Sequence, residues 1–156
     1  MQASETVTKT NPLLNIRIEK VTINIATGKS GEPLEKAKKV LNQLTNKTPT
    51  TKLAKKAIKD WGIRKGEPIA TVVTLRREDA SQFLTRALDA VSNKVNDSYV
   101  PELGIFGATV HVTLERPGYR LRRRSIRPAK IGKHHYVSKK EAIQFIQDNF
   151  RTQVGS

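Results

Sequence analysis

Two patterns of apolar residues predict an α+β fold for this chain. Along residues 16–25 apolar and polar side chains nearly alternate, which is typical of a strand with one buried face. Along residues 34–44 apolar side chains recur every three or four positions, which is typical of an amphipathic helix. The patterns continue in the order strand, helix, two strands in a hairpin, helix, strand. That order is the split β-α-β plan of ferredoxin-like domains, an antiparallel sheet with both helices on one face.

The first strand and helix have clear signals. The strand spans residues 16–25, with a slip in the alternation at Glu19-Lys20 that suggests a bulge. Ser30 or Gly31 starts the helix that follows, and Thr45-Asn46 ends it.

The central hairpin is predicted from three consecutive segments. Residues 57–63 supply its first strand and residues 64–68, Arg-Lys-Gly-Glu-Pro, supply the turn. Residues 69–76 are rich in β-branched side chains and supply the second strand.

The second helix is predicted to begin at Glu78 or Asp79, with Gln82 closing a capping box, and to end near Asn96. Its spacing predicts one buried stripe. The members of that stripe are Phe83, Leu84, Ala87, Leu88, Val91 and Val95.

The last two elements follow a connection that contains proline and glycine. Residues 108–115 alternate as another strand, and a capping box from Ser138 to Glu141 opens a short helix that reaches Phe150. We therefore expect a flexible tail over residues 1–13, an α+β core over 14–115, and a basic extension with a terminal helix over 116–156.

Composition limits the class of protein. A chain of 156 residues with 37% hydrophobic residues can form one core. It has no apolar stretch long enough for a membrane span or for a signal peptide, and no cysteine for disulfides or thiolate metal sites. We expect a cytoplasmic protein with no membrane partner.

Positive charge indicates the partner. The chain has 29 Lys and Arg against 14 Asp and Glu, a formal net charge of +15. Residues 116–140 contain no acidic residue, so their cations need either solvent or a polyanion, and nucleic acid is the leading candidate. A merely solvated basic tail is the alternative. The predicted phosphate-binding residues are Arg116, Arg120, Arg122, Arg123, Arg124, Arg127, Lys130 and Lys133.

Catalytic signals are weak. Residues 26–30, Ala-Thr-Gly-Lys-Ser, resemble part of a phosphate-binding loop, but Ile23 stands where such a loop needs glycine. The histidines lack the spacing of a metal site. Few aromatic residues are present, and Trp61, beside Ile63, is expected in the core rather than stacked on a base. We predict no enzyme activity and no cofactor, and a sheet that meets folded RNA through polar side chains.

A series of motifs resembles one known family. The residues that carry the resemblance lie at 19–28 (EKVTINIATG), 44–49, 54–56, 62–69 (GIRKGEPI), 73–76 (VTLR) and 104–107 (GIFG). Their order and spacing are similar to those of the universal large-subunit ribosomal protein family that is numbered five in bacteria. Residues 115–120 and the closing helix look like the archaeal and eukaryotic form.

The resemblance implies a structural protein of the large ribosomal subunit, located in the central protuberance. Its implied partners are 5S rRNA, large-subunit rRNA, peptidyl-site tRNA, a neighbouring 5S rRNA-binding ribosomal protein and a protein of the small-subunit head. A free-standing RNA chaperone and a phosphate-loop hydrolase centred on Lys29 are the rival hypotheses.

This chain departs from the family in length. Family members carry about two dozen more residues between the second helix and the GIFG motif, where this chain passes directly through residues 95–101.

The resemblance also implies particular contact residues. Lys47 stands where the family has glutamine, which replaces an amide with a cation. The implied residues are Asn24, Lys47, Thr74 and Arg76 for 5S rRNA, and Arg64, Lys65 and Gly66 for tRNA.

Overall fold

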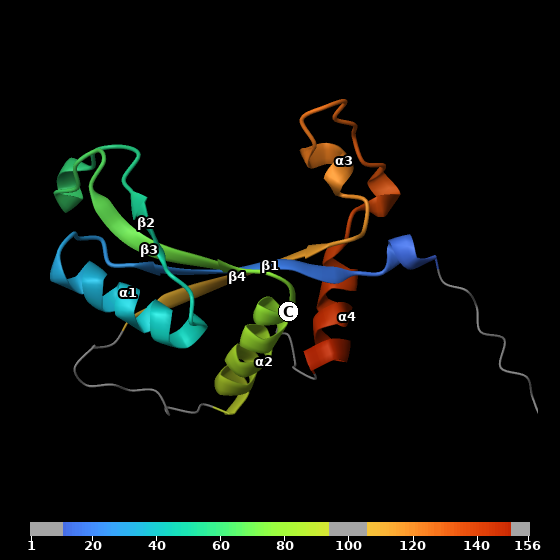
Figure 1. Cartoon of the computed structure of the whole chain (residues 1–156), viewed down its shortest axis with the longest axis horizontal. Helices are drawn as coiled ribbons and strands as arrows, with labels where there is room; N and C mark the ends of the chain where they lie inside the picture. Colours follow the sequence, from blue (N-terminus) through green and yellow to red (C-terminus); the bar gives the residue numbers. More distant parts are fainter. Residues whose placement is uncertain (1–10, 94–105, 151–156) are drawn as a thin grey trace, which may run out of the picture. The chain divides into compact units, whose positions relative to one another are not determined.

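The computed structural model describes residues 11–93 and 106–150. Of these, residues 18–113 form one compact unit, and residues 11–17 with 114–150 form a second. Figure 1 shows the order of the elements along the chain. The predicted end of the second helix near Asn96, its residue Val95 and the short connection at 95–101 lie outside the described residues.

A four-stranded sheet is built from β1 (Arg17–Ala26), β2 (Thr50–Leu53), β3 (Pro68–Leu75) and β4 (Ala108–Glu115), in the order β2-β3-β1-β4. β1 and β2 both pair with β3 in the antiparallel sense. Because each helix joins strands that are not neighbours, the topology is the predicted split β-α-β arrangement, and the α+β fold class is confirmed.

The hairpin prediction was partly wrong. The strand that pairs with β3 is β2, upstream of the predicted segment at residues 57–63. That segment instead contains a short 3-10 helix, Lys59–Trp61, ended by Gly62 with φ 67. Three consecutive polar or aromatic residues before a left-handed glycine favour a tight turn, whereas the β-branched pair Thr50-Thr51 favours a strand. The register shift of this sheet falls between Lys52 and Leu53, and a bulge at Glu19-Lys20 stays a prediction.

Helix α1 (Glu32–Thr45) agrees with its prediction. Gly31 precedes it with φ 94, Pro33 occupies the first turn, and Asn46 follows it in the left-handed conformation, donating its backbone N–H to Asn42. Helix α2 (Arg77–Asn93) begins one residue before the earliest predicted cap, so Glu78 and Asp79 lie in its first turn. Carboxylates in that turn still interact favourably with the positive end of the helix dipole.

The core of the first unit lies between the sheet and these two helices, which occupy the same side of the sheet in Figure 1. Alternation puts every second strand residue on this face. The strands contribute Val21, Ile23, Ile25, Val73 and Leu75, and the helices contribute Leu34, Ala37, Leu41, Ala80, Phe83 and Leu84, all buried. Leu88 and Ala87 of the predicted stripe are half-buried.

The second unit contains α3 (Arg120–Arg123), a 3-10 turn at Lys133–His135 and α4 (Lys139–Phe150). The predicted capping box of α4 is confirmed. Ser138 donates its backbone N–H to Glu141 Oε2 at 2.8 Å, and the N–H of Glu141 donates to Ser138 Oγ at 3.3 Å. In the described part of the chain, no helix has the length and apolar character needed to cross a membrane.

Replacing Ile23 with alanine tests the position of the core. Ile23 keeps only 1% of its surface exposed, so Ile23→Ala leaves a cavity between β1 and the helices. We expect a loss of about 2 to 5 kcal/mol in the free energy of unfolding, measured by urea denaturation. Val110→Ala, at a half-exposed position of β4, is the matched control and should change it by less than about 1 kcal/mol. Equal losses in both variants would contradict this core.

Candidate nucleic-acid interface

The face of the sheet opposite the core carries polar side chains. Thr22 lies opposite Thr74 in the ladder, and Asn24 lies opposite Val72. Residues directly opposite in an antiparallel pair share a face, and their neighbours Val21 and Ile23 point into the core. The structure therefore brings two predicted contact residues, Asn24 and Thr74, to the sheet face opposite α1 and α2 (Figure 1). Thr50 of β2, opposite Val72, extends this face.

Two other predicted 5S rRNA residues already have carboxylate partners. Lys47 Nζ lies 3.0 Å from Asp79, at the start of α2, and both side chains are about half exposed. Arg76 Nη1 lies 3.8 Å from Glu19. The Lys47–Asp79 pair is exposed and contributes little to stability, so Lys47 can exchange its carboxylate for a phosphate. The side chain of Glu19 is only 13% exposed, so the Arg76–Glu19 pair is partly buried. The interface prediction for Lys47 and Arg76 is not tested by this geometry.

The predicted tRNA residues Arg64, Lys65 and Gly66 form an exposed turn between β2 and β3. The carboxylate of Glu67 closes this turn by accepting the backbone N–H of Arg64 at 3.0 Å and the hydroxyl of Ser30 at 2.9 Å. The hydrogen bond from Arg64, followed by that from Ser30, lowers the pKa of Glu67. The turn therefore holds its two cations outward on a fixed backbone.

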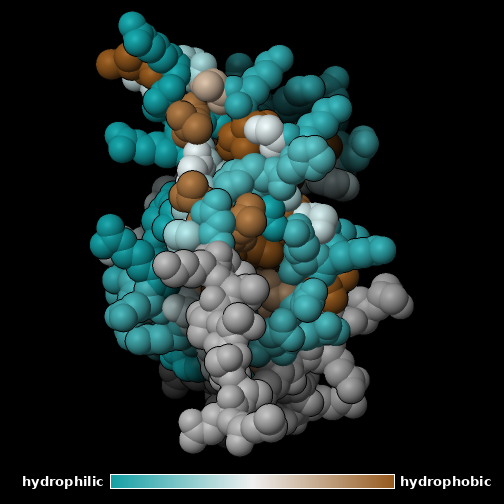
Figure 2. All heavy atoms as spheres, turned by 90° about the vertical axis from the view of Figure 1, so that its right-hand side faces the viewer, coloured by the Kyte–Doolittle hydropathy of each residue, from teal (hydrophilic) through white to brown (hydrophobic). Residues whose placement is uncertain are grey.

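The basic segment, residues 116–135, presents most of its cations to solvent. Figure 2 shows many hydrophilic side chains in the upper part of this view, with hydrophobic ones among them. In the described chain, no carboxylate pairs with six of the predicted phosphate-binding residues. These exposed cations are Arg120, Arg122, Arg124, Arg127, Lys130 and Lys133.

Two arginines of the basic segment pair with carboxylates that lie outside it. We expected cations without local counter-charge, but Glu115, only 6% exposed, accepts hydrogen bonds from Arg17 at 2.7 and 3.0 Å and pairs with Arg123. The expectation was therefore wrong for Arg123. Glu115 lies immediately before the basic segment, so the segment itself contains no acidic residue but has one beside it.

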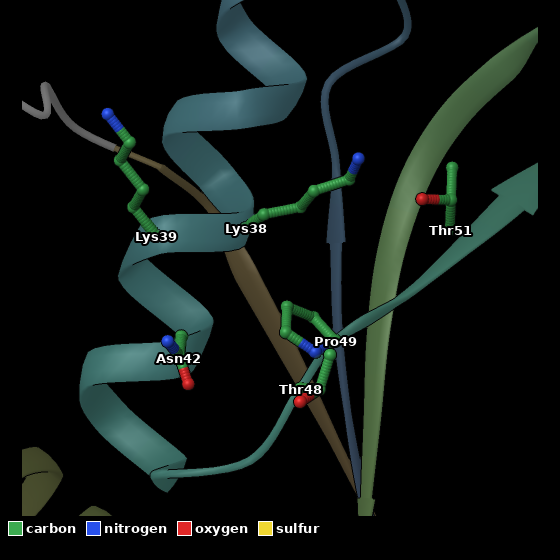
Figure 3. Close-up of a pocket in the computed structure, with 6 residues that line it drawn as sticks. All are labelled: Lys38, Lys39, Asn42, Thr48, Pro49 and Thr51. Carbon is green, nitrogen blue, oxygen red and sulfur yellow. The ribbon is translucent and has the colours of Figure 1, made fainter.

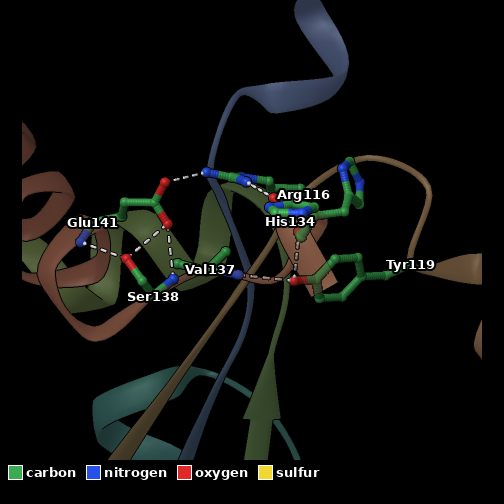
Figure 4. Close-up of polar contacts among 7 residues, drawn as sticks. Arg116, Tyr119, His134, Val137, Ser138 and Glu141 are labelled. Atoms are coloured by element: carbon green, nitrogen blue, oxygen red, sulfur yellow. Dashed lines mark hydrogen bonds and ion pairs between the residues drawn. The ribbon is translucent and has the colours of Figure 1, made fainter. Parts of the chain in front are cut away.

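Arg116 was also expected to lack a carboxylate partner. It is instead buried, with 7% of its surface exposed, and it has such a partner. Its guanidinium donates to Glu141 Oε1 at 2.6 Å and to the carbonyl of His134 at 3.2 Å (Figure 4). Glu141 thus caps α4 and neutralises Arg116 with its two oxygens. An arginine held in this way anchors the segment, and its predicted phosphate contact would require this pair to open.

Tyr119 fixes the far side of the same segment. Its hydroxyl donates to the carbonyl of His135 and accepts the N–H of Val137, both at 3.2 Å (Figure 4 shows the contact with Val137). His135 Nε2 lies 2.8 Å from the carbonyl of Pro117, so it donates to that oxygen. The exposed cations thus lie on a loop whose two ends are joined by hydrogen bonds between Tyr119 and Val137 and between Pro117 and His135.

A small open cavity of 340 Å³ lies between α1 and β2. Figure 3 shows Lys38 extending toward the strands and Lys39 pointing away from them. Lys38 is paired with Glu35 at 2.7 Å. The remaining lining residues are Asn42, Thr48, Pro49 and Thr51. No acid and base converge here, which fits a polar binding surface better than a catalytic pocket.

The structure gives no support to a phosphate loop at Lys29. The backbone N–H groups of Thr27 and Gly28 both donate to the carbonyl of Ile69, at 3.0 and 3.1 Å. A phosphate loop needs such groups free to surround the phosphate. Among the described residues, no group of His, Asp and Glu side chains could hold a metal ion.

A polar sheet face and a basic loop are features typical of α+β nucleic-acid-binding proteins. The family model described as Ribosomal protein L5 matches residues 11–64. Large ribosomal subunit protein uL5 of Pyrobaculum aerophilum is 45% identical over 168 residues, covering 94% of both chains. That of Caldivirga maquilingensis is 45% identical over 88% of this chain and 81% of the relative, and that of Nitrosopumilus maritimus 38% over 92% and 95%.

This chain therefore belongs to the uL5 family of the large ribosomal subunit. It is a structural constituent of the ribosome and not an enzyme, as the sequence predicted. The alignment with the Pyrobaculum protein runs over more residues than the 156 of this chain, so that relative contains residues without a counterpart here.

The capping carboxylate Glu141 gives a pH prediction. Hydrogen bonds from the N–H and then the hydroxyl of Ser138, followed by Arg116, lower the pKa of Glu141 from its ordinary value of 4.5. A lowered pKa means that this group stabilises the fold fully above about pH 4.5 and that its contribution is lost as the pH falls through the lower, folded value. We expect the thermal unfolding midpoint to fall more steeply below pH 4.5 in the parent than in Glu141→Gln.

The control for this titration is Asp148→Asn, an exposed carboxylate in the same helix. It should retain the parent's pH dependence. If Glu141→Gln also retains it, Glu141 does not make the contacts described here.

Proposed function

We propose that this protein binds 5S rRNA in the central protuberance through the open face of its sheet. The observation that carries the proposal is the placement of Asn24 and Thr74 on the one sheet face that neither helix covers. Amide and hydroxyl groups on a flat surface can hydrogen bond the ribose hydroxyls and base edges of folded RNA. Aromatic residues do not occupy this part of β1 and β3, so stacking is not the mechanism there.

The exposed cations of the basic segment have a different role in this proposal. They contact phosphates of the large-subunit rRNA, which supply affinity without reading sequence. Because Arg116 and Arg123 are paired with Glu141 and Glu115, they hold the loop in place while its other cations meet the RNA.

The turn at Arg64, Lys65 and Gly66 is our candidate for the contact with peptidyl-site tRNA. It projects two cations past the end of the sheet on a backbone that Glu67 holds. A protein of the small-subunit head and a neighbouring 5S rRNA-binding protein complete the proposed partners, on the basis of the family resemblance. A free-standing RNA chaperone is disfavoured by family membership.

Binding to isolated 5S rRNA should weaken with salt but persist. With about 5 to 8 phosphates neutralised, the slope of log affinity against log salt should be roughly −4 to −7. Asn24→Ala and Thr74→Ala should each reduce the preference for 5S rRNA over bulk RNA by about 1 kcal/mol, the value of one hydrogen bond. Thr85→Ala, an exposed threonine of α2, is the matched control. If both sheet variants bind like the parent, the sheet face is not the interface.

The basic segment has its own test. Replacing Arg122, Arg124 and Arg127 together with alanine should make the salt slope shallower by about 2 to 3, because about 0.7 to 0.9 is lost for each phosphate contact. The fold should remain, since Arg116 and Arg123 keep their partners. Lys36→Ala, which removes a lysine paired with Glu32 within α1, is the control. An unchanged slope in the arginine variant would place the RNA elsewhere.

A further inference from the structure

The connection between β2 and β3, residues 54–67, folds into a defined lobe (the β2–β3 lobe). Ile58 and Ile63 exchange backbone hydrogen bonds of 2.9 and 3.1 Å, and Ala54 is joined to Gly66 and Glu67 by bonds of 2.9 and 2.8 Å. Ala54 and Ile63 are buried. In Figure 1 the lobe, drawn in green, extends beyond the ends of β2 and β3. Backbone hydrogen bonds therefore hold the base of the lobe, beyond the ends of the two strands.

Trp61 stands on this lobe with 72% of its surface exposed, against the expectation that it belongs to the core. It ends the 3-10 turn Lys59–Trp61, and the left-handed Gly62 then returns the chain so that Ile63, two residues on, enters the core. Burial of Trp61 was expected because Ile63 is close in sequence. The turn at Gly62 separates the two side chains, so Ile63 is buried and the indole is exposed. An indole so exposed gains little from folding, although tryptophan is usually well buried.

The charges around Trp61 select the kind of partner. Six cations in and beside the lobe are exposed, and no carboxylate in the described residues pairs with them. The nearby Glu67 is directed to Arg64 N and Ser30, which leaves Asp60 as the exposed carboxylate of the lobe. An exposed aromatic ring on a lobe rich in cations complements a phosphate backbone that carries bases. The cations are Lys52, Lys55, Lys56, Lys59, Arg64 and Lys65.

We propose that Trp61 is a stacking platform for an unpaired RNA base, with the lysines of the β2–β3 lobe holding the phosphates on either side of it. This deepens the proposed function, because it adds a base contact to the β2–β3 lobe, whose turn at Arg64, Lys65 and Gly66 offers only charge. Stacking requires an accessible base face, so the site should accept loops and single strands and reject continuous duplex. Cations alone would bind both forms.

The chain contains a single tryptophan, so its fluorescence reports on this position alone. The test titrates the full chain with a single-stranded RNA of about ten nucleotides and with a duplex of the same sequence, at one salt concentration. We expect quenching of Trp61 by the single strand and little by the duplex, even where anisotropy of a labelled RNA shows that the duplex binds.

Affinity for the labelled single strand gives the second readout. Trp61→Leu keeps an apolar side chain but removes the ring, and should weaken binding by roughly five- to a hundredfold. Trp61→Phe should lie between it and the parent. Leu53→Ala, which alters another exposed apolar residue beside the lobe, should bind like the parent.

Equal quenching by single strand and duplex, or by polyglutamate, would overturn the proposal, because the ring would then report only a nearby polyanion. Unchanged affinity in Trp61→Leu would overturn it as well. The oligonucleotide assay does not depend on 5S rRNA. Failure of stacking with intact 5S rRNA binding therefore rejects this inference alone, and the reverse result rejects only the proposed function.

Discussion

Repulsion among cations is the constraint that the rest of this structure accommodates. With a net charge of +15, the chain must keep most of its Lys and Arg side chains in solvent, where screening weakens their repulsion. Two carboxylates pair with three arginines of the second unit, and of these arginines Arg116 is buried. Glu115 joins Arg17 and Arg123, and Glu141 joins Arg116. These two acidic residues flank the basic segment in sequence and neutralise its Arg116 and Arg123 without RNA.

The sheet likewise separates a buried apolar face from a polar face. Alternation directs Val21, Ile23 and Ile25 toward the two helices and leaves Thr22 and Asn24 on the opposite face. Because the split β-α-β topology places both helices on one side, the polar face needs no apolar cover. The fold thus produces a broad polar surface from local alternation, with no pocket or cofactor required to position it.

Much of this fold could be predicted from sequence because its signals are local. The glycine and proline at the start of α1 and the capping box of α4 each act within four residues, and the structure confirms both. The errors arose where distant contacts decide. Residues 57–63 contain apolar side chains that suit a strand, yet β3 pairs with β2 instead. The burial of Arg116 depends on Glu141, 25 positions away, which no local pattern indicates.

The candidate site divides in the same way. Asn24 and Thr74 could be placed on one face because strand periodicity and antiparallel pairing determine it. The exposure of Trp61 could not, since the direction of the indole depends on the turn at Gly62. A glycine directly after an aromatic residue in a Lys-rich stretch was the available signal.

Photo-crosslinking followed by mass spectrometry of native large subunits tests the central claim most directly, that RNA covers the open sheet face and the basic segment. RNA cross-links should map to β1 and β3, to the β2–β3 lobe and to residues 120–133. They should be missing from the outer face of α2, which carries Thr85, Arg86 and Asp89. Cross-links concentrated on α2, with none on the sheet or the basic segment, would contradict the account.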